Sequence, residues 1–260
     1  MNHSPRKRFG QNFLRDEAVV QRIVMAVNPR PCDHLVEIGP GEGVMTSALL
    51  KNNVPLDAVE IDRDLVAHLR QRFASQPHFR LHQADALKFD FATLSTGTKL
   101  RIVGNLPYNI STPLLFRLFA TTGIIEDMHF MLQREVIERL CAGPGEPDYG
   151  RLGIMAQYYC RAEKLFDVYP ESFYPPPKVV SAIVRLVPHE HPPVDAEPAA
   201  LGQVVATAFS QRRKTLRNSL KSLFDEAALQ EAGIDPSARA ETLSLEQYAR
   251  LAKMWQESAR

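Results

Sequence analysis

The residues that bear most directly on chemistry are Asn105, Leu106, Pro107 and Tyr108, which follow the largely apolar run 100–104. An amino group on a purine ring is a weak nucleophile, because its lone pair is delocalised into the ring. The amide oxygen of Asn105 and a backbone carbonyl at Leu106 or Pro107 can accept the two hydrogens of such a group, and the Tyr108 ring can stack on the base. The alternative interpretation is structural, with a strand that ends in an Asn-x-Pro turn.

A second group of residues is typical of a nucleoside site. Gly39, Gly41 and Gly43 lie in a turn between an expected strand and an expected helix, where glycine permits tight turning and close approach to a ligand. Glu60 lies about twenty residues on, where a carboxylate can accept both ribose hydroxyls. Asp85, after a third strand, can accept from an adenine amino group. Each acid alone is also typical of a surface cap, but together they indicate the ligand crevice of an α/β sheet.

The same spacing leaves an NAD-dependent oxidoreductase as an alternative. The turn 39–43 does not match G-x-G-x-x-G, since Val44 stands where the third glycine is expected. No His or Lys general acid for hydride transfer is evident. A methyl donor whose electrophilic carbon lies near Asn105 accounts better for the fourth strand.

These residues need a scaffold of alternating strands and helices. The predicted strands cover 34–38, 56–61, 79–82, 100–104 and 127–132, with two more near 163–168 and 181–187. The predicted helices cover 44–50, about 64–73, 112–120 and 135–141, and Asp16 is expected to cap an earlier helix that ends before Pro29. The alternation predicts an α/β fold with a mostly parallel sheet of about seven strands.

The C-terminal part has a different pattern. We expect residues 1–188 to form the first domain, the Pro-rich segment 189–198 to be a linker, and 199–260 to form a small all-α domain. Ser244 and Gln247 match a capping box that opens the last helix.

The net charge of +1 conceals a segregation of basic residues. Residues 1–15 and 211–224 contain no acidic residue, so the rest of the chain is acidic. Two basic segments predict contact with a polyanion, with several of the second group on one helix face. The alternative is two solvated basic faces. The basic residues expected to bind RNA are Arg6, Lys7, Arg8, Arg212, Arg213, Lys214, Arg217 and Lys221.

The three cysteines, Cys32, Cys141 and Cys160, form no CxxC motif, so we expect a reduced cytoplasmic protein without zinc or another metal. No apolar run approaches the roughly 20 residues of a membrane span, and no signal peptide is evident, so no membrane contact is expected.

Several motifs closely resemble those of the ribosomal RNA adenine dimethyltransferases. The principal ones are 7–14, 37–43 and 105–114, and the similarity continues through 133–140, 149–152, 155–159, 173–179 and 209–217, which covers nearly the whole chain. Within this family, the chain is most similar to the bacterial small-subunit branch linked to kasugamycin sensitivity. Val180 and the pair Val44-Met45 depart slightly from the family pattern without touching the expected chemistry.

The resemblance implies a Rossmann-like methyltransferase that uses S-adenosylmethionine to dimethylate N6 of two adjacent adenosines near the 3′ end of small-subunit (16S) rRNA. It implies a substrate within an immature 30S-type particle, and we expect a monomer. It also implies that Phe173 stacks on the target base opposite Tyr108. The residues expected at the cofactor are Asn12, Leu14, Gly39, Gly41, Glu60, Ile61, Asp85, Ala86 and Asn105.

Two further alternatives remain. A ribosome-assembly factor that binds immature subunits, with methylation secondary, also fits the basic segments. A DNA adenine methyltransferase shares the Asn-x-Pro-Tyr logic, and it is disfavoured mainly by the rest of the resemblance.

Overall fold

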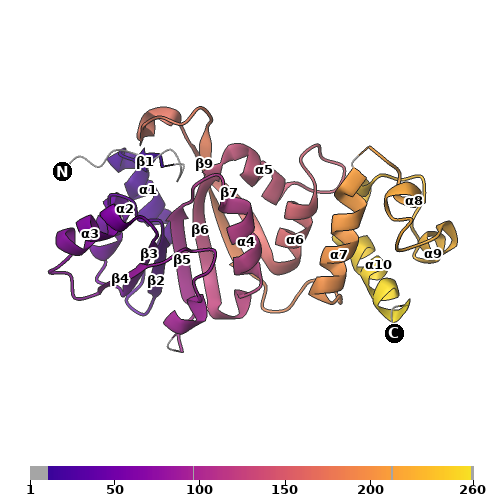
Figure 1. The fold of residues 1–260 in the computed structure, drawn as a ribbon, viewed down its shortest axis with the longest axis horizontal. Helices are drawn as coiled ribbons and strands as arrows, with labels where there is room; N and C mark the ends of the chain where they lie inside the picture. Colours follow the sequence, from indigo (N-terminus) through magenta and orange to yellow (C-terminus); the bar gives the residue numbers. More distant parts are fainter. Residues whose placement is uncertain (1–10, 96, 212, 259–260) are drawn as a thin grey trace. The chain divides into compact units, whose positions relative to one another are not determined.

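A computed structural model of the 260-residue chain describes residues 11–95, 97–211 and 213–258 (Figure 1). Its packing divides the chain into two compact units. The first contains the described residues up to Ile137 together with Glu163–Pro188, and the second contains Glu138–Ala162 and His189 onward. The second unit therefore includes a segment that lies within the first domain expected from the sequence.

The first unit is built on a seven-stranded sheet in the order β4-β3-β2-β5-β6-β9-β7 among the described residues. All neighbours from β4 to β6 pair in parallel, and β9 pairs antiparallel with β6. This confirms the predicted mostly parallel sheet. The strands are β2 (His34–Ile38), β3 (Leu56–Glu60), β4 (Phe79–Gln83), β5 (Leu100–Asn105), β6 (Ile125–Gln133), β7 (Cys160–Val168) and β9 (Ser181–Pro188).

The helices that alternate with these strands agree closely with the predicted ones. They are α1 (Glu17–Val27), α2 (Val44–Leu50), α3 (Arg63–Arg72), α4 (Ser111–Phe119) and α5 (Arg134–Cys141). Asp16 caps α1 as expected, since its carboxylate accepts from the backbone N–H groups of Ala18 and Val19. Short 3₁₀ turns lie at η2 (Phe91–Leu94), η3 (Thr122–Ile124), η4 (Pro170–Ser172), η5 (Phe209–Gln211) and η6 (Ala240–Thr242).

The central strands are largely buried because a parallel sheet is covered on both faces. All five residues of β2 are buried. Helices α1 and α2 pack on one face, where Ile23 and Leu49 share a core cluster with Val103 of β5.

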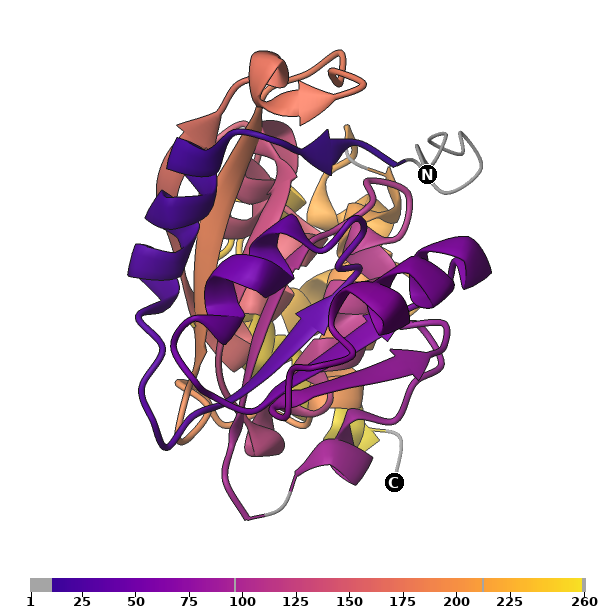
Figure 2. The same ribbon diagram turned by 90° about the vertical axis from the view of Figure 1, so that its left-hand side faces the viewer.

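A two-stranded ribbon joins two distant parts of the sequence. Strand β1 (Phe13–Leu14) pairs antiparallel with β8 (Phe173–Tyr174), and Figure 2 shows the two strands side by side. Ser172 strengthens this connection, because its carbonyl accepts from the Arg15 N–H and its hydroxyl donates to Asp16. The ribbon therefore fixes the start of α1 to the segment that precedes β9.

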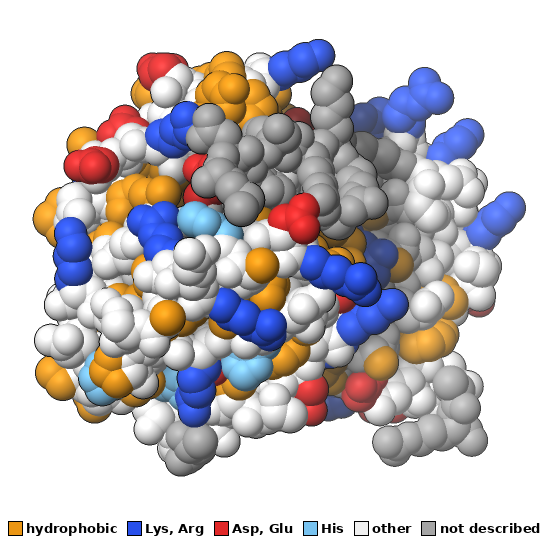
Figure 3. All heavy atoms as spheres, turned by 60° about the vertical axis from the view of Figure 1, so that its left-hand side comes forward, with side chains coloured by type: hydrophobic (Ala, Val, Ile, Leu, Met, Phe, Trp, Pro, Cys, Tyr) orange, Lys and Arg blue, Asp and Glu red, His pale blue; other side chains and the backbone are white. Residues whose placement is uncertain are grey.

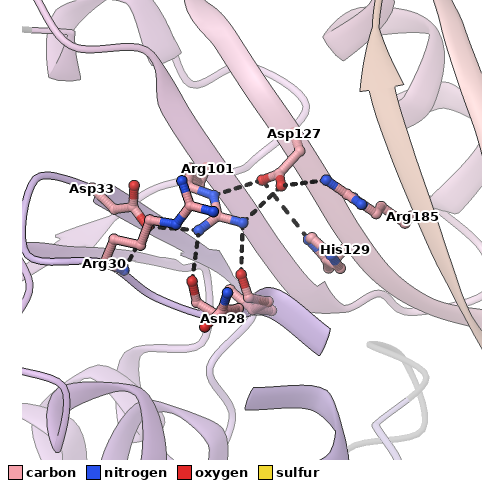
Figure 4. Close-up of polar contacts among 8 residues, drawn as sticks. Asn28, Arg30, Asp33, Arg101, Asp127, His129 and Arg185 are labelled. Carbon is pink, nitrogen blue, oxygen red and sulfur yellow. Dashed lines mark hydrogen bonds and ion pairs between the residues drawn. The ribbon is translucent and has the colours of Figure 1, made fainter. Parts of the chain in front are cut away.

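A buried ionic network lies where α1 ends (Figure 4). Arg101 of β5 donates to both carboxylate oxygens of Asp127 on β6, at 2.9 and 2.7 Å, and to Asp33 at 2.6 Å. It also donates to the carbonyls of Val27 and Asn28, so one guanidinium serves the end of α1 and two strands.

A second polar cluster joins β2, β3 and β4 near the ends where these strands begin. Asp57 is fully buried and accepts hydrogen bonds from Arg80, and it lies 2.6 Å from ring nitrogens of His34 and His82. These partners hold the pKa of Asp57 well below its usual value although burial alone would raise it.

The second unit is helical. Its helices are α6 (Arg151–Tyr159), α7 (Pro198–Ala208), α8 (Leu216–Ser219), α9 (Glu226–Glu231) and α10 (Leu245–Ser258). The capping box is confirmed, since the Ser244 N–H donates to the Gln247 side chain and the Gln247 N–H donates to the Ser244 hydroxyl. Helix α6, which was not predicted from the sequence, packs against α7 and α10.

The prediction that several basic residues of 211–224 share one helix face is wrong. Helix α8 contains only Arg217 of the described basic group, while Arg213 and Lys214 lie in the turn before it and Lys221 follows it. The chain bends here because Thr215 forms a β-bridge with Arg239. All four of these basic side chains are nevertheless exposed.

Candidate active site

A cavity of about 230 Å³ opens where β2, β3, β4 and β5 end. Parallel strands bring their carboxyl ends to one edge of a sheet, which is where open α/β sheets bind ligands. The lining residues are 11–14, 37–42, 44–45, 59–61, 65, 84–87 and 105–110. This set contains every residue that the sequence assigned to the cofactor, together with Leu106, Pro107 and Tyr108.

The glycine turn forms one wall of the cavity, and two of its positions require glycine. Gly41 has φ +59°, and a Cβ there would lie 3.1 Å from the Phe13 ring. Gly43 has φ +81°, and a Cβ there would lie 2.7 Å from the Phe73 ring. Both positive φ values are unfavourable for other residues.

Glu60 lies beside this turn. It is only 5% exposed, and its carboxylate accepts from the Asp62 N–H at 2.8 Å and lies 3.4 Å from the Gly41 nitrogen. Burial raises the pKa of Glu60, while these backbone N–H groups oppose the increase. Asp85 after β4 accepts from the Leu87 N–H at 2.9 Å, which orients its carboxylate in the cavity wall.

The cavity is acidic. The residues that line it include four acidic ones, Glu37, Glu42, Glu60 and Asp85, and no Lys or Arg is among them in the described part of the chain. Such a lining favours a ligand with positive charge. The described residues contain no group of three or more His, Cys, Asp or Glu side chains arranged to hold a metal ion.

The Asn105 side chain is oriented by a residue near the N-terminus of the chain. Its side-chain nitrogen donates to the Asn12 carbonyl at 3.0 Å. The amide oxygen is therefore the end of the side chain that remains to accept a hydrogen bond from a group in the cavity.

Tyr108 is held by β9. Its hydroxyl lies 2.9 Å from that of Ser181, which is buried at the start of this strand. Burial raises the pKa of Tyr108, so the phenol stays protonated. The turn between Asn105 and α4 is closed by a hydrogen bond from the Ile110 N–H to the Pro107 carbonyl.

Phe173 does not lie where the sequence analysis expected. It is 5% exposed, belongs to the core cluster with Leu14 and Ile183, and does not line the cavity. The β1–β8 register explains this, because Leu14 and Phe173 face each other on the core side of the ribbon. In this conformation, stacking on a base would require Phe173 to leave the core.

Phe13 and Tyr174, the neighbouring residues of the ribbon, lie on the opposite face from Leu14 and Phe173. Tyr174 is 51% exposed, and the Arg15 guanidinium lies 4.2 Å from the centre of its ring. Its partner in the register is Phe13, which lines the cavity. From the sequence, Phe13 was expected either to contact RNA or to anchor the N-terminal arm to the core, and its place at the cavity was not expected although it stands between two expected cofactor residues. The role of Ser181 was not expected either, because no local signal points to it.

The basic residues fall into two groups. Arg213, Lys214, Arg217 and Lys221 are exposed in the second unit, whereas Arg6, Lys7, Arg8 and Arg212 lie outside the residues that the structure describes. In the described part of the chain, no helix has the length and apolar character needed to cross a membrane.

Known proteins with similar sequences cover nearly the whole chain. The family model for ribosomal RNA adenine dimethylase matches residues 2–257. A protein from Methylococcus capsulatus named ribosomal RNA small subunit methyltransferase A is 62% identical over 97% of this chain and 98% of its own length. A protein of the same name from Pseudomonas putida is 57% identical over 96% of this chain and 94% of its own length.

Solved structures show the same fold. A dimethyladenosine transferase from Plasmodium falciparum superimposes with a TM-score of 0.82 at 24% identity, over 95% of this chain and 98% of that one. The 23S rRNA methyltransferase ErmE gives 0.72 at 28% identity, over 94% of this chain and 100% of that one. The family model matches nearly the whole chain, and the two relatives are more than 50% identical to it over nearly their full length. This chain therefore belongs to the ribosomal RNA adenine dimethylase family.

Proposed function

We propose that this protein dimethylates N6 of two adjacent adenosines in a loop near the 3′ end of small-subunit rRNA. Membership of the family supports the reaction class, and the names of the relatives support the small subunit as the source of the substrate. The observation that carries the proposal is the Asn105 amide, whose nitrogen is occupied by Asn12 and whose oxygen is left for an exocyclic amine.

The residues present fit S-adenosylmethionine, the methyl donor of this family. The acidic lining suits a cationic nucleoside, and the Gly41 turn lets backbone approach it closely. Glu60 would hold the ribose hydroxyls and Asp85 the adenine amino group. When bound, the donor supplies a methyl group on positively charged sulfur, which is open to attack by a nucleophile.

Asn105 prepares the target amine. Its oxygen would accept one N6 hydrogen, and a backbone carbonyl would accept the other. The Leu106 carbonyl is the better candidate, because the Pro107 carbonyl already accepts from the Ile110 N–H. These acceptors draw the nitrogen lone pair out of conjugation, so positioning and electrostatics account for most of the rate gain.

Tyr108 would receive the base. Its ring lines the cavity while its hydroxyl is occupied by Ser181, which leaves the ring face for stacking. Base–aromatic stacking contributes roughly 1–3 kcal/mol per base. A loop adenosine suits this pocket because it is more easily unstacked than a paired one.

Exposed basic side chains would hold the RNA backbone. Arg213, Lys214, Arg217 and Lys221 are exposed. On the face drawn in Figure 3, which is turned toward the left-hand side of Figure 1, Lys and Arg side chains are scattered among acidic and hydrophobic ones. We further propose that the enzyme acts as a monomer on an immature 30S-type particle in the cytoplasm and contributes to its assembly.

The direct test is methyl transfer from labelled S-adenosylmethionine to immature small subunits, followed by mapping of the modified bases. We expect two neighbouring dimethyladenosines near the 3′ end. Label at another base, or on 23S rRNA alone, would refute the proposed substrate. A catalytically inactive Asn105 variant that still promotes subunit assembly would separate binding from methylation.

A further inference from the structure

The β1–β8 ribbon carries an exposed aromatic ring beside the cavity. Tyr174 is 51% exposed and stands directly opposite Phe13, which lines the cavity. The Cβ atoms of residues that oppose each other in an antiparallel pair lie about 5 Å apart, and both side chains leave the same face of the ribbon. The Tyr174 ring therefore lies at the edge of the cavity, on the side of the ribbon that Phe13 shares.

Arg15 connects this ring to the cavity mouth. Its guanidinium lies 4.2 Å from the centre of the Tyr174 ring and 3.8 Å from the carboxylate of Glu42, which lines the cavity. The Arg15 side chain is still 54% exposed. An ion pair as exposed as this one is weak, so the charge of Arg15 remains available to an anion that approaches the mouth.

The reaction at Asn105 leaves the Arg15–Tyr174 pair without a role. Tyr108 is the ring that receives the target base, and Phe173 is buried in the core. An exposed ring with a guanidinium against it is a combination that suits single-stranded RNA, because bases stack on aromatic rings and guanidinium planes while the positive charge attracts phosphate. The pair thus has the chemistry to hold a nucleotide outside the cavity.

We propose that the Arg15–Tyr174 pair holds the nucleotide next to the target adenosine, with its base stacked on the pair and its phosphate attracted by the guanidinium. The inference rests on the proposed function, which assigns the target adenosine to the cavity. When one base enters the cavity, the RNA strand must continue past the mouth, where Arg15 and Glu42 meet. The pair would fix the direction in which the strand leaves.

Stacking is also suited to a substrate with two adjacent targets. Each target adenosine has the other as one of its neighbours, so the base on the pair is unmodified in one round and dimethylated in another. Stacking uses the face of a base and not its N6 edge. The pair would therefore accept the neighbouring adenosine before and after its methylation.

The first test is the kinetics of methyl transfer to immature small subunits. Tyr174→Ala should raise KM for the subunits about tenfold, as loss of one base stack does, with a much smaller change in kcat and unchanged affinity for the donor. Tyr174→Phe keeps the ring and should behave as the wild type. Tyr169→Ala is the matched control, because it removes a ring that is 53% exposed outside the ribbon, and its KM should equal that of the wild type.

The charge of Arg15 is tested separately. Arg15→Gln should reduce the slope of log affinity for the subunits against log salt by about one, and Arg15→Lys should restore the slope. An unchanged slope in Arg15→Gln would show that the guanidinium only supports the ring and does not meet a phosphate.

The position of the nucleotide is tested by photo-crosslinking. With p-benzoylphenylalanine at position 174, crosslinks to immature small subunits should map to the nucleotide that adjoins a target adenosine, whereas the same group at position 169 should give no crosslink there. Crosslinks from position 174 to distant rRNA or to protein alone would overturn the inference, and they decide the matter even if Tyr174→Ala fails to fold.

Two kinetic results would also overturn it. One is a wild-type KM in Tyr174→Ala, and the other is an equal loss in Tyr174→Phe, which would assign the effect to the hydroxyl and not to stacking. If the wild type transfers no methyl group to small subunits, the proposed function fails together with the inference. Normal transfer by both the wild type and Tyr174→Ala would refute the inference alone.

Discussion

The Asn105 amide is oriented by the protein itself, through its 3.0 Å hydrogen bond to the Asn12 carbonyl. Asn105→Ala should therefore lower methyl transfer by about a hundredfold or more, as loss of one preorganised polar contact does elsewhere. The fold should persist, because the side chain lines a cavity. Single-turnover rates and thermal unfolding would measure both effects. Asn105→Asp keeps an acceptor oxygen but loses the N–H group that donates to the Asn12 carbonyl. Near-normal turnover of the Asn105→Ala variant would contradict the role proposed for the amide.

The hydrogen bond between the hydroxyls of Tyr108 and Ser181 should orient the Tyr108 ring. Tyr108→Phe and Ser181→Ala should each raise KM for RNA while leaving affinity for the donor unchanged, because the hydroxyl pair orients the stacking ring. In a double-mutant cycle the two changes should be coupled by about 1 kcal/mol. Ser181→Thr should restore most of the activity. Strict additivity would mean that the hydroxyl pair does not position the ring.

At the scale of elements, Arg101 connects α1 to β5 and β6. Arg101→Ala should cost about 3–5 kcal/mol of unfolding free energy, because it leaves the buried Asp127 without its main partner. Arg185→Ala is the matched control, since this more exposed arginine lies 3.7 Å from the same carboxylate, and its loss should cost about 1 kcal/mol or less. Denaturant unfolding would measure both. Equal losses would show that Arg101 is not the centre of the network.

His129 belongs to the same network, and its lowered pKa leads us to expect a pH-dependent free energy of unfolding. Burial lowers the pKa of His129 to about 4, and the nearby Arg101 and Arg185 charges add to this although Asp127 opposes it. The folded pKa lies below the unfolded value of about 6.5, so the unfolded state binds more protons between these values. The unfolding free energy should therefore fall as pH drops from about 6.5 to about 4. His129→Gln should remove much of this slope, and an identical pH profile in that variant would contradict the assignment.

Strand ends could be predicted from the sequence, whereas pairing between distant segments could not. Glu60, Asp85 and Asn105 each stand at or just after the end of a strand, and parallel topology then brings them to one edge of the sheet. The position of Phe173 depends instead on its pairing with Leu14, a contact between residues that lie far apart in the sequence and that no local pattern reveals.

Residues 211–224 show the same limit in the second unit. Their basic residues suggested a helix face, but the bridge from Thr215 to Arg239 bends the chain there. The charge composition was informative about exposure, because Lys214 and Arg217 are indeed at the surface. Composition carries no information about a bridge to a residue far along the sequence.

For the whole molecule, binding to RNA should depend steeply on salt. Lys214→Gln should reduce the slope of log affinity against log salt by about one if Lys214 contacts a phosphate. Lys253→Gln removes a lysine from α10, outside the basic segment, and should leave the slope unchanged. Binding to small-subunit rRNA at several salt concentrations would measure this. Equal slopes for Lys214→Gln and the wild type would favour a merely solvated basic surface.

The acidic cavity has a consequence for how a polyanion can be modified at all. Acidic residues line the cavity, while residues 213–221 carry exposed cations that would attract phosphate. The negative charge of the cavity should repel the sugar-phosphate backbone of RNA. It should not repel an uncharged base that is flipped out of the RNA strand. The charge distribution would thus admit a nucleobase to the cavity and keep out the backbone that carries it.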